Sequence, residues 1–183
     1  MKTGKVKHQS NQYDKIFKEN IEAVIPSLMQ KVLGITAISS EELPDDIQHT
    51  KERKPDVLKK ITDINRKTFV LQIEFQVADE PEMVYRMLDY KSMLLRKYKL
   101  PVKQFVIFLG KGKPKMPTEL NTEDLGFKYR LLSIKTIDYK TFLKSNKPEE
   151  IVFSIAFSGF SMPKLLKTAK TISSGLFDFK KVL

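Results

Sequence analysis

The sequence predicts an α/β domain, and three segments carry this prediction. Residues 69–77 (FVLQIEFQV) largely alternate apolar and polar side chains, which is typical of a β-strand with one apolar face. Residues 81–99 begin with a proline and carry apolar side chains at helical spacing, which predicts a helix. Residues 104–110 (QFVIFLG) form a continuous apolar run, which predicts a strand buried on both faces. An apolar strand that follows a helix in this way indicates an α/β crossover.

The other elements are predicted from weaker patterns of apolar side chains, prolines and glycines. A first helix is expected from about Tyr13 to Gly34, and Pro26 is expected to kink it or divide it in two. The further expected elements are a loop at 38–46, strands at 47–53 and 55–61, a turn at 62–67, a loop at 110–126, a strand at 127–137, and helices beginning near Asp138 and Pro148.

Length and composition predict one main domain. The chain has 183 residues, of which 41% are hydrophobic, and this suits a single hydrophobic core. We therefore expect a flexible basic arm at 1–12, one domain at 13–160, and a C-terminal tail at 161–183, helical in part. The absence of cysteine fits a reducing, intracellular setting, so we expect a cytoplasmic protein. We expect no signal peptide, because residues 1–12 contain no apolar stretch, and no membrane span, because the longest apolar run (151–160) is too short and too polar.

The net charge of +11 favours a polyanionic partner, and the basic residues are unevenly distributed. Residues 91–115 contain basic side chains and no acidic ones: Lys91, Arg96, Lys97, Lys99, Lys103, Lys111, Lys113 and Lys115. Such a stretch is consistent with nucleic-acid binding and equally with a solubilising surface.

Two carboxylates are expected to meet in the hairpin formed by residues 55–61 and 68–77. A turn centred on Asn65 places Asp56 directly opposite Glu74, where Cβ atoms lie roughly 4.5–5.5 Å apart. The repulsion between the two charges has to be offset by a cation, a proton, or a basic side chain such as Lys54 or Lys60. A hard divalent ion such as Mg²⁺ would suit these oxygen ligands. An ordinary exposed hairpin face is the alternative, and a register shift of one residue would separate the two side chains.

Three further side chains could act beside these carboxylates. Gln76 lies two residues after Glu74, on the same face of the strand, and could orient water or a phosphate oxygen. Arg86 and Tyr90 lie four residues apart on the second helix and therefore share a face that could touch a phosphate backbone. A solvated surface charge is an equally good interpretation of Arg86.

The segment KPDVLKKITDINRKTFVLQIEFQ resembles motifs II and III of the PD-(D/E)XK nuclease superfamily. Pro55-Asp56 corresponds to the PD element, and Glu74-Phe75-Gln76 corresponds to (D/E)XK with glutamine in place of lysine. Within the superfamily, the chain resembles the family of recombination-promoting nucleases and related transposases. The segments that carry this likeness are YDKIFKENIE, HTKERKPD, LQIEFQ, MVYRMLDY and LLRKYKLPVKQFVIFLG, which span residues 13–110.

The resemblance implies a restriction-endonuclease-like core of a helix, three antiparallel strands, a helix and a strand, here followed by an added strand and C-terminal helices. It implies that Asp56, Glu74 and the Phe75 carbonyl hold Mg²⁺ or Mn²⁺, and that Gln76 occupies the catalytic lysine position. It also implies an acidic residue from the first helix. Position on the helix favours Asp14, whereas the resemblance favours Glu19, which we select; Glu22 is a third candidate.

The function expected from this resemblance is a metal-dependent DNA endonuclease that hydrolyses phosphodiester bonds, linked to recombination or transposition. Basic residues of the second helix and the following loop are expected to bind DNA, namely Arg86 with Tyr90, and Lys111, Lys113 and Lys115. A catalytically inactive DNA-binding module is the main alternative, and an assembly protein is another. A homodimer is compatible with a DNA endonuclease and with an inactive DNA-binding module.

Overall fold

The computed structural model describes residues 21–44, 55–110, 112–138 and 140–143, together with residues 145, 147, 150, 153 and 154. The chain divides into two compact units. One unit comprises Ile35–Ile137 and contains the sheet, and the other combines Met1–Gly34 with Asp138–Leu183. The predicted arm at 1–12 and the predicted tail at 161–183 lie outside the described residues.

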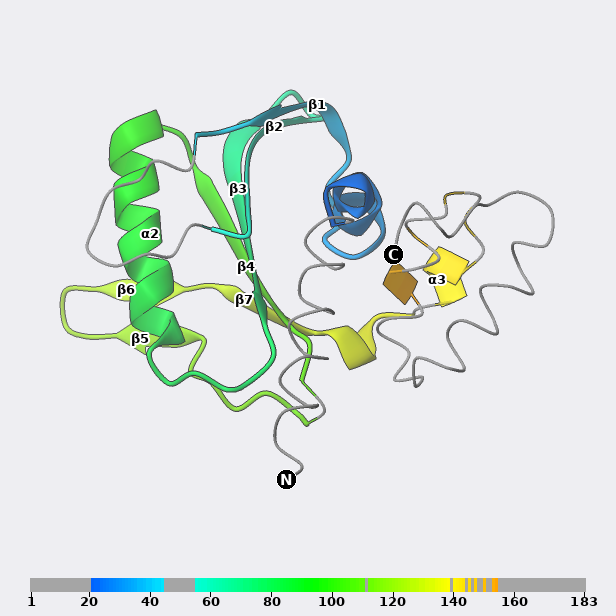
Figure 1. Cartoon of the computed structure of the whole chain (residues 1–183). Helices are drawn as coiled ribbons and strands as arrows, with labels where there is room; N and C mark the ends of the chain where they lie inside the picture. The colour runs from blue at the N-terminus through cyan, green and yellow to red at the C-terminus, as the bar shows by residue number, and fades with distance from the viewer. Residues whose placement is uncertain are drawn as a thin grey trace. The chain divides into compact units, whose positions relative to one another are not determined.

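The unit of residues 35–137 is built on a mixed five-stranded sheet, which confirms the α/β class (Figure 1). The strands lie in the order β1-β2-β3-β4-β7; β1, β2 and β3 are antiparallel, and β4 and β7 continue in parallel. Their bounds are β1 Ala37–Glu42, β2 Val57–Asp63, β3 Thr68–Gln76, β4 Val102–Phe108 and β7 Arg130–Ser133. A separate two-stranded sheet pairs β5 Glu119–Asn121 with β6 Gly126–Lys128.

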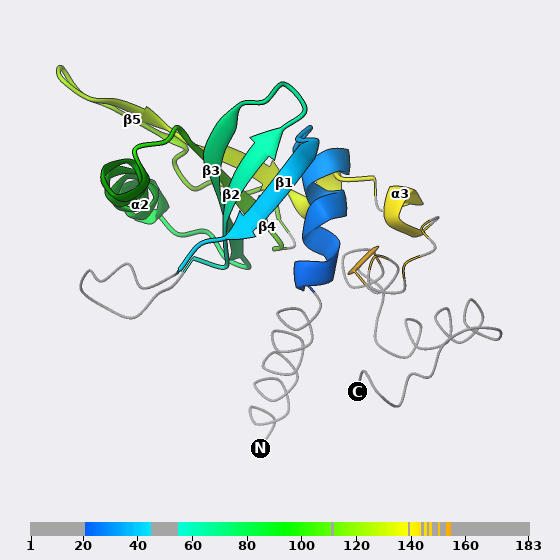
Figure 2. The same cartoon turned by 90° about the horizontal axis from the view of Figure 1, so that it is seen from above.

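Helix α2 (Met83–Tyr98) forms the crossover between β3 and β4 and lies along one face of the sheet (Figure 1). It begins two residues after Pro81 and ends at Lys99, which has a positive φ of 54° and donates its N–H to the Leu95 carbonyl. The helix and strand β4 appear where the sequence predicts them. The buried side of α2 packs in one hydrophobic cluster with β4 and with the β5–β6 hairpin, which extends beside the helix (Figure 2).

Strand β3 is buried on both of its faces, which differs from the half-exposed strand that its alternation predicts. Gln72 is fully buried, and Glu74 is 6% exposed. The cause is α2, because Gln72 lies against Met87 of that helix. The polar side of β3 therefore faces the inside of the protein over most of its length.

One predicted loop and one predicted strand need correction. The segment predicted as a loop at 38–46 contains most of strand β1, whose six residues are all exposed. This strand is held by its backbone pairing with β2 at the sheet edge, so it has no apolar pattern to reveal it. The strand predicted at 127–137 is divided into β6, β7 and a short 3₁₀ helix at Ile134–Thr136. The strand predicted at 47–53 lies outside the described residues.

The second unit joins a helix near the beginning of the chain to short helical pieces near its end. The helix covers residues 21–31 without interruption at Pro26, and Gly34 follows it with a positive φ of 66°. Helix α3 (Lys140–Leu143) follows Asp138, the predicted cap, whose Oδ1 accepts a hydrogen bond from the Lys140 N–H at 3.1 Å. Among the described residues, no helix combines the length and apolar character needed to cross a bilayer.

A buried carboxylate connects the two parts of this unit. Glu150 is 1% exposed; it accepts a hydrogen bond from the Ser27 hydroxyl and lies 2.8 Å from Lys31 Nζ. Burial raises the pKa of Glu150, but hydrogen bonds from Lys31, Ser27 and Ser145 outweigh it, so that its pKa falls below the ordinary value. The ionised form is therefore the form that stabilises the fold.

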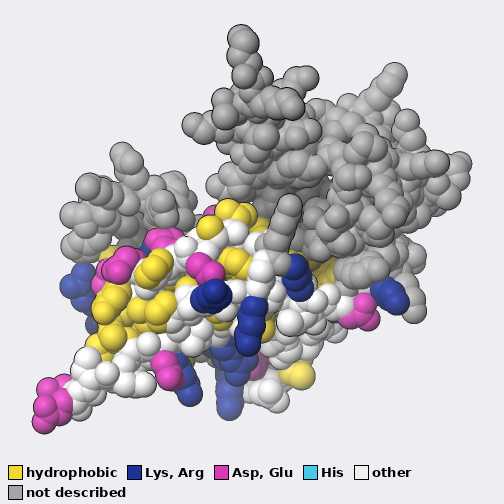
Figure 3. Space-filling model, turned by 90° about the horizontal axis from the view of Figure 1, so that it is seen from below, with side chains coloured by type: hydrophobic (Ala, Val, Ile, Leu, Met, Phe, Trp, Pro, Cys, Tyr) yellow, Lys and Arg dark blue, Asp and Glu magenta, His cyan; other side chains and the backbone are white. Residues whose placement is uncertain are grey.

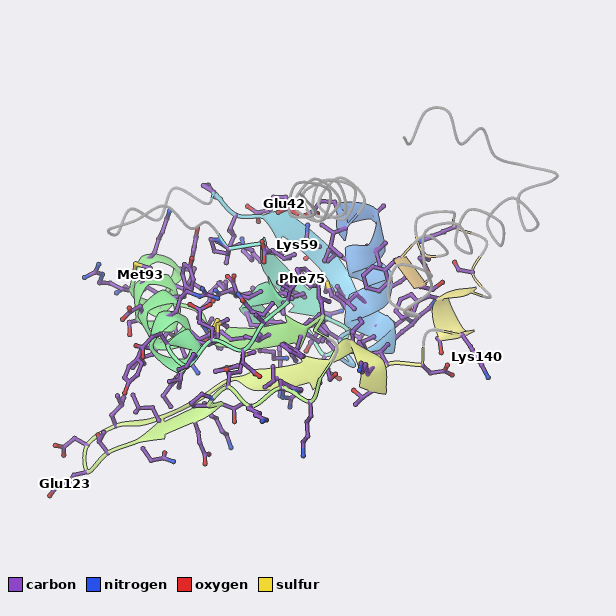
Figure 4. All side chains as sticks on the ribbon, turned by 60° about the horizontal axis from the view of Figure 1, so that its bottom comes forward. Glu42, Lys59, Phe75, Met93, Glu123 and Lys140 are labelled. Atoms are coloured by element: carbon purple, nitrogen blue, oxygen red, sulfur yellow. The ribbon has the colours of Figure 1, made fainter. Side chains whose placement is uncertain are left out.

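We expect Glu150→Gln to lower the free energy of unfolding at neutral pH by about 1.5–3 kcal/mol, the typical contribution of a hydrogen bond to a charged group. Since the pKa of Glu150 is lowered by folding, its contribution is fully present above the ordinary pKa and is lost as the pH falls through the folded-state pKa. The difference between parent and variant in urea unfolding should therefore shrink in acid. Glu123→Gln, at the exposed tip of the β5–β6 hairpin (Figure 4), is the control. A constant difference at all pH values would contradict this assignment.

Candidate functional site

The β2–β3 hairpin has the register that the sequence predicts. Val57 pairs with Ile73, and Thr62 pairs with Thr68 at the turn. Asp63 fixes the turn, because its Oδ1 accepts hydrogen bonds from the N–H groups of Asn65 and Lys67 at 2.9 and 3.0 Å. Asp56 immediately precedes β2, so the same register continued by one residue places it opposite Glu74. Residues directly opposite in an antiparallel pair share a face of the sheet.

Asp56 is held by the backbone of β3 beside Glu74. The Phe75 N–H donates to Asp56 Oδ2 at 2.9 Å, and Phe75 itself is labelled on β3 in Figure 4. This hydrogen bond continues the attachment of β2 to β3 beyond the last paired residue. The two carboxylates therefore belong to the same end of the hairpin, at the point where β3 ends.

The Glu74 carboxylate accepts a hydrogen bond from a chain of two buried side-chain amides, Gln72 and Gln104. Gln72 Nε2 donates to Glu74 Oε1 at 3.0 Å, and Gln104 Nε2 donates to Gln72 Oε1 at 2.8 Å. Gln104 Nε2 also lies 2.7 Å from the Met87 carbonyl oxygen of α2. The sequence does not single out Gln72 or Gln104 for a role. A signal was available, because Gln104 is the polar residue at the start of the otherwise apolar run of residues 104–110.

Gln76 is half-buried at the last position of β3, on the face that also carries Glu74. Its carbonyl accepts a hydrogen bond from the Leu109 N–H at 2.6 Å, directly beyond the last β3–β4 pair. Gly110 follows, and a Cβ added there would lie 2.6 Å from the Val77 carbonyl oxygen. The ends of β3 and β4 are thus held together closely around Gln76.

The basic side chains predicted to offset the two carboxylates lie elsewhere or outside the described residues. Lys60 Nζ is 3.0 Å from Glu41 of β1, and the neighbouring Lys59 pairs with Glu42 (Figure 4). Lys54 lies outside the described residues. The contacts described above for Asp56 and Glu74 come from neutral N–H donors, which lower the energy of an anion without cancelling its charge.

The donor set at this end of the hairpin suits a hard divalent cation. Among the described residues, no group of three or more His, Cys, Asp or Glu side chains could hold a metal ion. A site here would use two carboxylates and a backbone carbonyl. Mg²⁺ in enzymes that act on phosphates is commonly held by one or two carboxylates, with water and substrate oxygens completing its shell. Two carboxylates therefore fit Mg²⁺ or Mn²⁺ better than a structural metal with an all-protein shell.

The three candidate acids of the first helix lie outside the described residues or in the other unit. Asp14 and Glu19 lie outside the described residues. Glu22 is exposed on the helix of residues 21–31, which belongs to the other unit. The choice among the three acids stays a prediction.

The basic loop after β4 is attached close to the end of β3. Asp79 Oδ1 accepts hydrogen bonds from the N–H groups of Lys115 and Met116 at 2.6 and 3.0 Å. Lys113 and Lys115 are exposed in this loop, and Lys111 lies outside the described residues. Because Asp79 is three residues beyond Gln76, this attachment ties the loop to the segment that leaves the candidate site. Figure 3 shows several Lys and Arg side chains on the visible face of the described part, interspersed with Asp and Glu side chains.

Arg86 and Tyr90 make internal contacts. Arg86 Nη1 lies 3.1 and 3.0 Å from the two carboxylate oxygens of Glu80. Tyr90 is 7% exposed and belongs to the hydrophobic cluster under α2. The structure therefore gives Tyr90 a packing role, and we leave both residues out of the proposed DNA surface.

The site and sheet define an α/β protein in which Asp56 and Glu74 lie at the same end of the β2–β3 hairpin. Comparison of the chain with protein-family models, with curated proteins and with solved structures finds no match. The inference about function therefore rests on the residues and their geometry, together with the motif resemblance of the sequence.

Proposed function

We propose that the chain is a metal-dependent nuclease of the PD-(D/E)XK type that hydrolyses phosphodiester bonds in DNA. One observation carries this proposal. The β2–β3 register runs to the pair of Val57 with Ile73, next to Asp56 and Glu74, and the Phe75 N–H donates a hydrogen bond to the Asp56 carboxylate. These are the residues that correspond to the nuclease motifs, and they lie at the same end of one hairpin.

Each residue of the site has a distinct task in this proposal. Asp56 and Glu74, with the Phe75 carbonyl, would hold Mg²⁺ or Mn²⁺. When bound, the cation would supply positive charge at the phosphate and lower the pKa of water. Gln76, on the same face as Glu74, would orient water or a phosphate oxygen through its amide. Lys113 and Lys115, with Lys111, would attract the DNA backbone.

The order of elements supports the same proposal. A helix, three antiparallel strands, a crossover helix and a parallel strand follow one another, as the resemblance implies. The mixed sheet is compatible with a restriction-endonuclease-like core, to which β7 adds a strand.

The direct test is nicking of supercoiled plasmid by the purified full chain. We expect cleavage with Mg²⁺ or Mn²⁺ and none with EDTA. Calorimetric titration with Mn²⁺, without DNA, should show binding to the parent protein. A parent that neither binds Mn²⁺ nor cleaves plasmid would contradict the proposal.

A catalytically inactive DNA-binding module is the second candidate, and Gln76 is the observation that favours it. Lysine at this position can orient water and also offset phosphate charge, whereas glutamine can only orient. We expect Gln76→Lys to fold normally and to raise the nicking rate by about 10-fold, the effect of about 1.4 kcal/mol in the barrier. A parent that binds DNA but gains no cleavage from this change would favour the inactive module.

Removal of the loop lysines should weaken DNA binding through the loss of counterion release. We expect the triple variant Lys111→Ala/Lys113→Ala/Lys115→Ala to bind all sequences more weakly, and the slope of log affinity against log salt to fall by about 3. Fluorescence anisotropy with a labelled duplex across a salt series measures both effects.

The control for this experiment removes the same charge elsewhere. Lys67, Lys128 and Lys135 are exposed lysines outside the loop, and their combined replacement by alanine should change the slope much less. Equal effects of the two triple variants would show that net charge, and not the loop, governs binding.

A further inference from the structure

The amide chain beneath Glu74 has a direction that its acceptors fix. Gln104 Nε2 faces two acceptors, Gln72 Oε1 at 2.8 Å and the Met87 carbonyl oxygen at 2.7 Å. A flipped Gln104 amide would place an oxygen against both of them, so one orientation alone is favourable. Because Gln72 must then present its oxygen to Gln104, its Nε2 is directed to Glu74 Oε1. A carbonyl of α2 thus determines which group meets the Glu74 carboxylate.

This arrangement contains a polar atom that the fold leaves unsatisfied. Gln104 Oε1 is buried and has no hydrogen-bond partner within the part of the chain that the structure describes. A buried acceptor without a donor destabilises the folded state, and paired apolar side chains of similar shape avoid this cost. The neighbours of the two glutamines are apolar. Val70 and Val106 lie two residues away on the same strands, Met87 of α2 contacts Gln72, and all three are fully buried. Packing alone therefore does not explain two glutamines at these positions.

We propose that Gln72 and Gln104 are positioning residues, which hold the Glu74 carboxylate in the orientation needed to bind the divalent cation. This inference rests on the proposed nuclease function. Gln72 occupies one lone pair of Glu74 Oε1 and fixes the side chain, and Gln104 prevents the Gln72 amide from turning. Partners that orient a metal ligand in this way commonly change metal affinity by about 10- to 100-fold when removed.

The test replaces both amides together. Gln72→Leu/Gln104→Leu removes the donor to Glu74, which lowers stability, and also removes the unsatisfied oxygen, which raises it, so the variant should unfold close to the parent's temperature. The Met87 carbonyl keeps its place in the ladder of α2, where the N–H four residues later can bond it. We expect Mn²⁺ affinity, measured by calorimetry without DNA, to fall by about 10-fold or more. A purely structural role predicts the opposite pattern, with stability changed and Mn²⁺ affinity retained.

The matched control is Thr62→Val/Thr68→Val. These threonines form a cross-strand hydrogen-bonded pair at 3.0 Å in the same hairpin, at its turn end. Their replacement also exchanges a polar pair for an apolar one, yet it should leave Mn²⁺ affinity unchanged. If the double leucine variant does not fold, Gln104→Met tests the same idea by releasing the Gln72 amide, with an affinity expected below that of the parent. Parental Mn²⁺ affinity in a folded variant of either kind would overturn the inference.

A crystal structure without metal separates this inference from the proposed function. In the double leucine variant, the Glu74 carboxylate should leave its parental position, and a carboxylate that stays in place would overturn the positioning role. If the parent binds no Mn²⁺ but Glu74 moves in the variant, the nuclease proposal is contradicted. The amide chain would then still be shown to position the Glu74 carboxylate.

Discussion

Glu74→Gln is expected to reduce metal-dependent plasmid nicking by about 100-fold or more. The amide keeps the size and polarity of the side chain but removes the negative charge that attracts a hard cation. A metal ion contributes several kcal/mol to stabilising charge in the transition state, and each 1.4 kcal/mol corresponds to a tenfold change in rate. DNA affinity measured without metal should stay the same or rise, because a charge that repels phosphate has been removed.

Asp56→Ala provides the second arm of this experiment. It should also abolish nicking, and it additionally removes the acceptor of the Phe75 N–H, so some loss of stability is expected. Measurement of Mn²⁺ binding in both variants distinguishes loss of the cation from damage to the fold. Nicking that survives both substitutions would belong to another site or to a contaminant.

Gly110→Ala is expected to destabilise the protein by about 1–3 kcal/mol, the usual range for inserting atoms into a packed region. The added Cβ would lie 2.3 Å from the Phe108 ring and 2.6 Å from the Val77 carbonyl oxygen. The ring is buried and the carbonyl belongs to the backbone, so relief requires the ends of β3 and β4 to separate. Since Gln76 lies at that junction, nicking should fall together with stability.

Gly112→Ala is the matched control, because a Cβ added there meets nothing within 4 Å. It changes the same loop by the same single methyl group. Urea unfolding should be close to that of the parent, and nicking should be preserved. Similar losses in both variants would mean that loop flexibility matters more than the close packing at the strand ends.

The sequence contains enough information to predict the hairpin and its register. The turn is specified by Asp63 and Asn65, and the alternation in β3 fixes which residues share a face. Once both are known, the prediction that Asp56 lies opposite Glu74 follows from geometry. The crossover of α2 and β4 is predictable for a similar reason, because Pro81 and the apolar run at 104–110 mark its two elements.

Features that depend on tertiary packing are less accessible to a reading of the sequence. β1 has no buried side chain, so only its backbone pairing identifies it. The alternation in β3 predicts a polar face but cannot tell that α2 covers this face and buries Glu74. In the same way, helical spacing places Arg86 and Tyr90 on one face of the helix. It does not indicate that Arg86 pairs with Glu80 or that Tyr90 is buried.

The contact between Ser27 and Glu150 has a consequence for the order in which the protein folds during synthesis. Glu150 emerges from the ribosome 119 residues after Lys31 and 123 residues after Ser27. All of residues 35–137 are made in the interval, and this unit contains every strand of both sheets. Domains generally fold as units in the order of their synthesis. The sheet can therefore form on the nascent chain before Glu150, the partner of the helix of residues 21–31, has been synthesised. A chain truncated before Glu150 would keep Asp56 and Glu74 of the hairpin but would lack the residue that joins the two parts of the other unit.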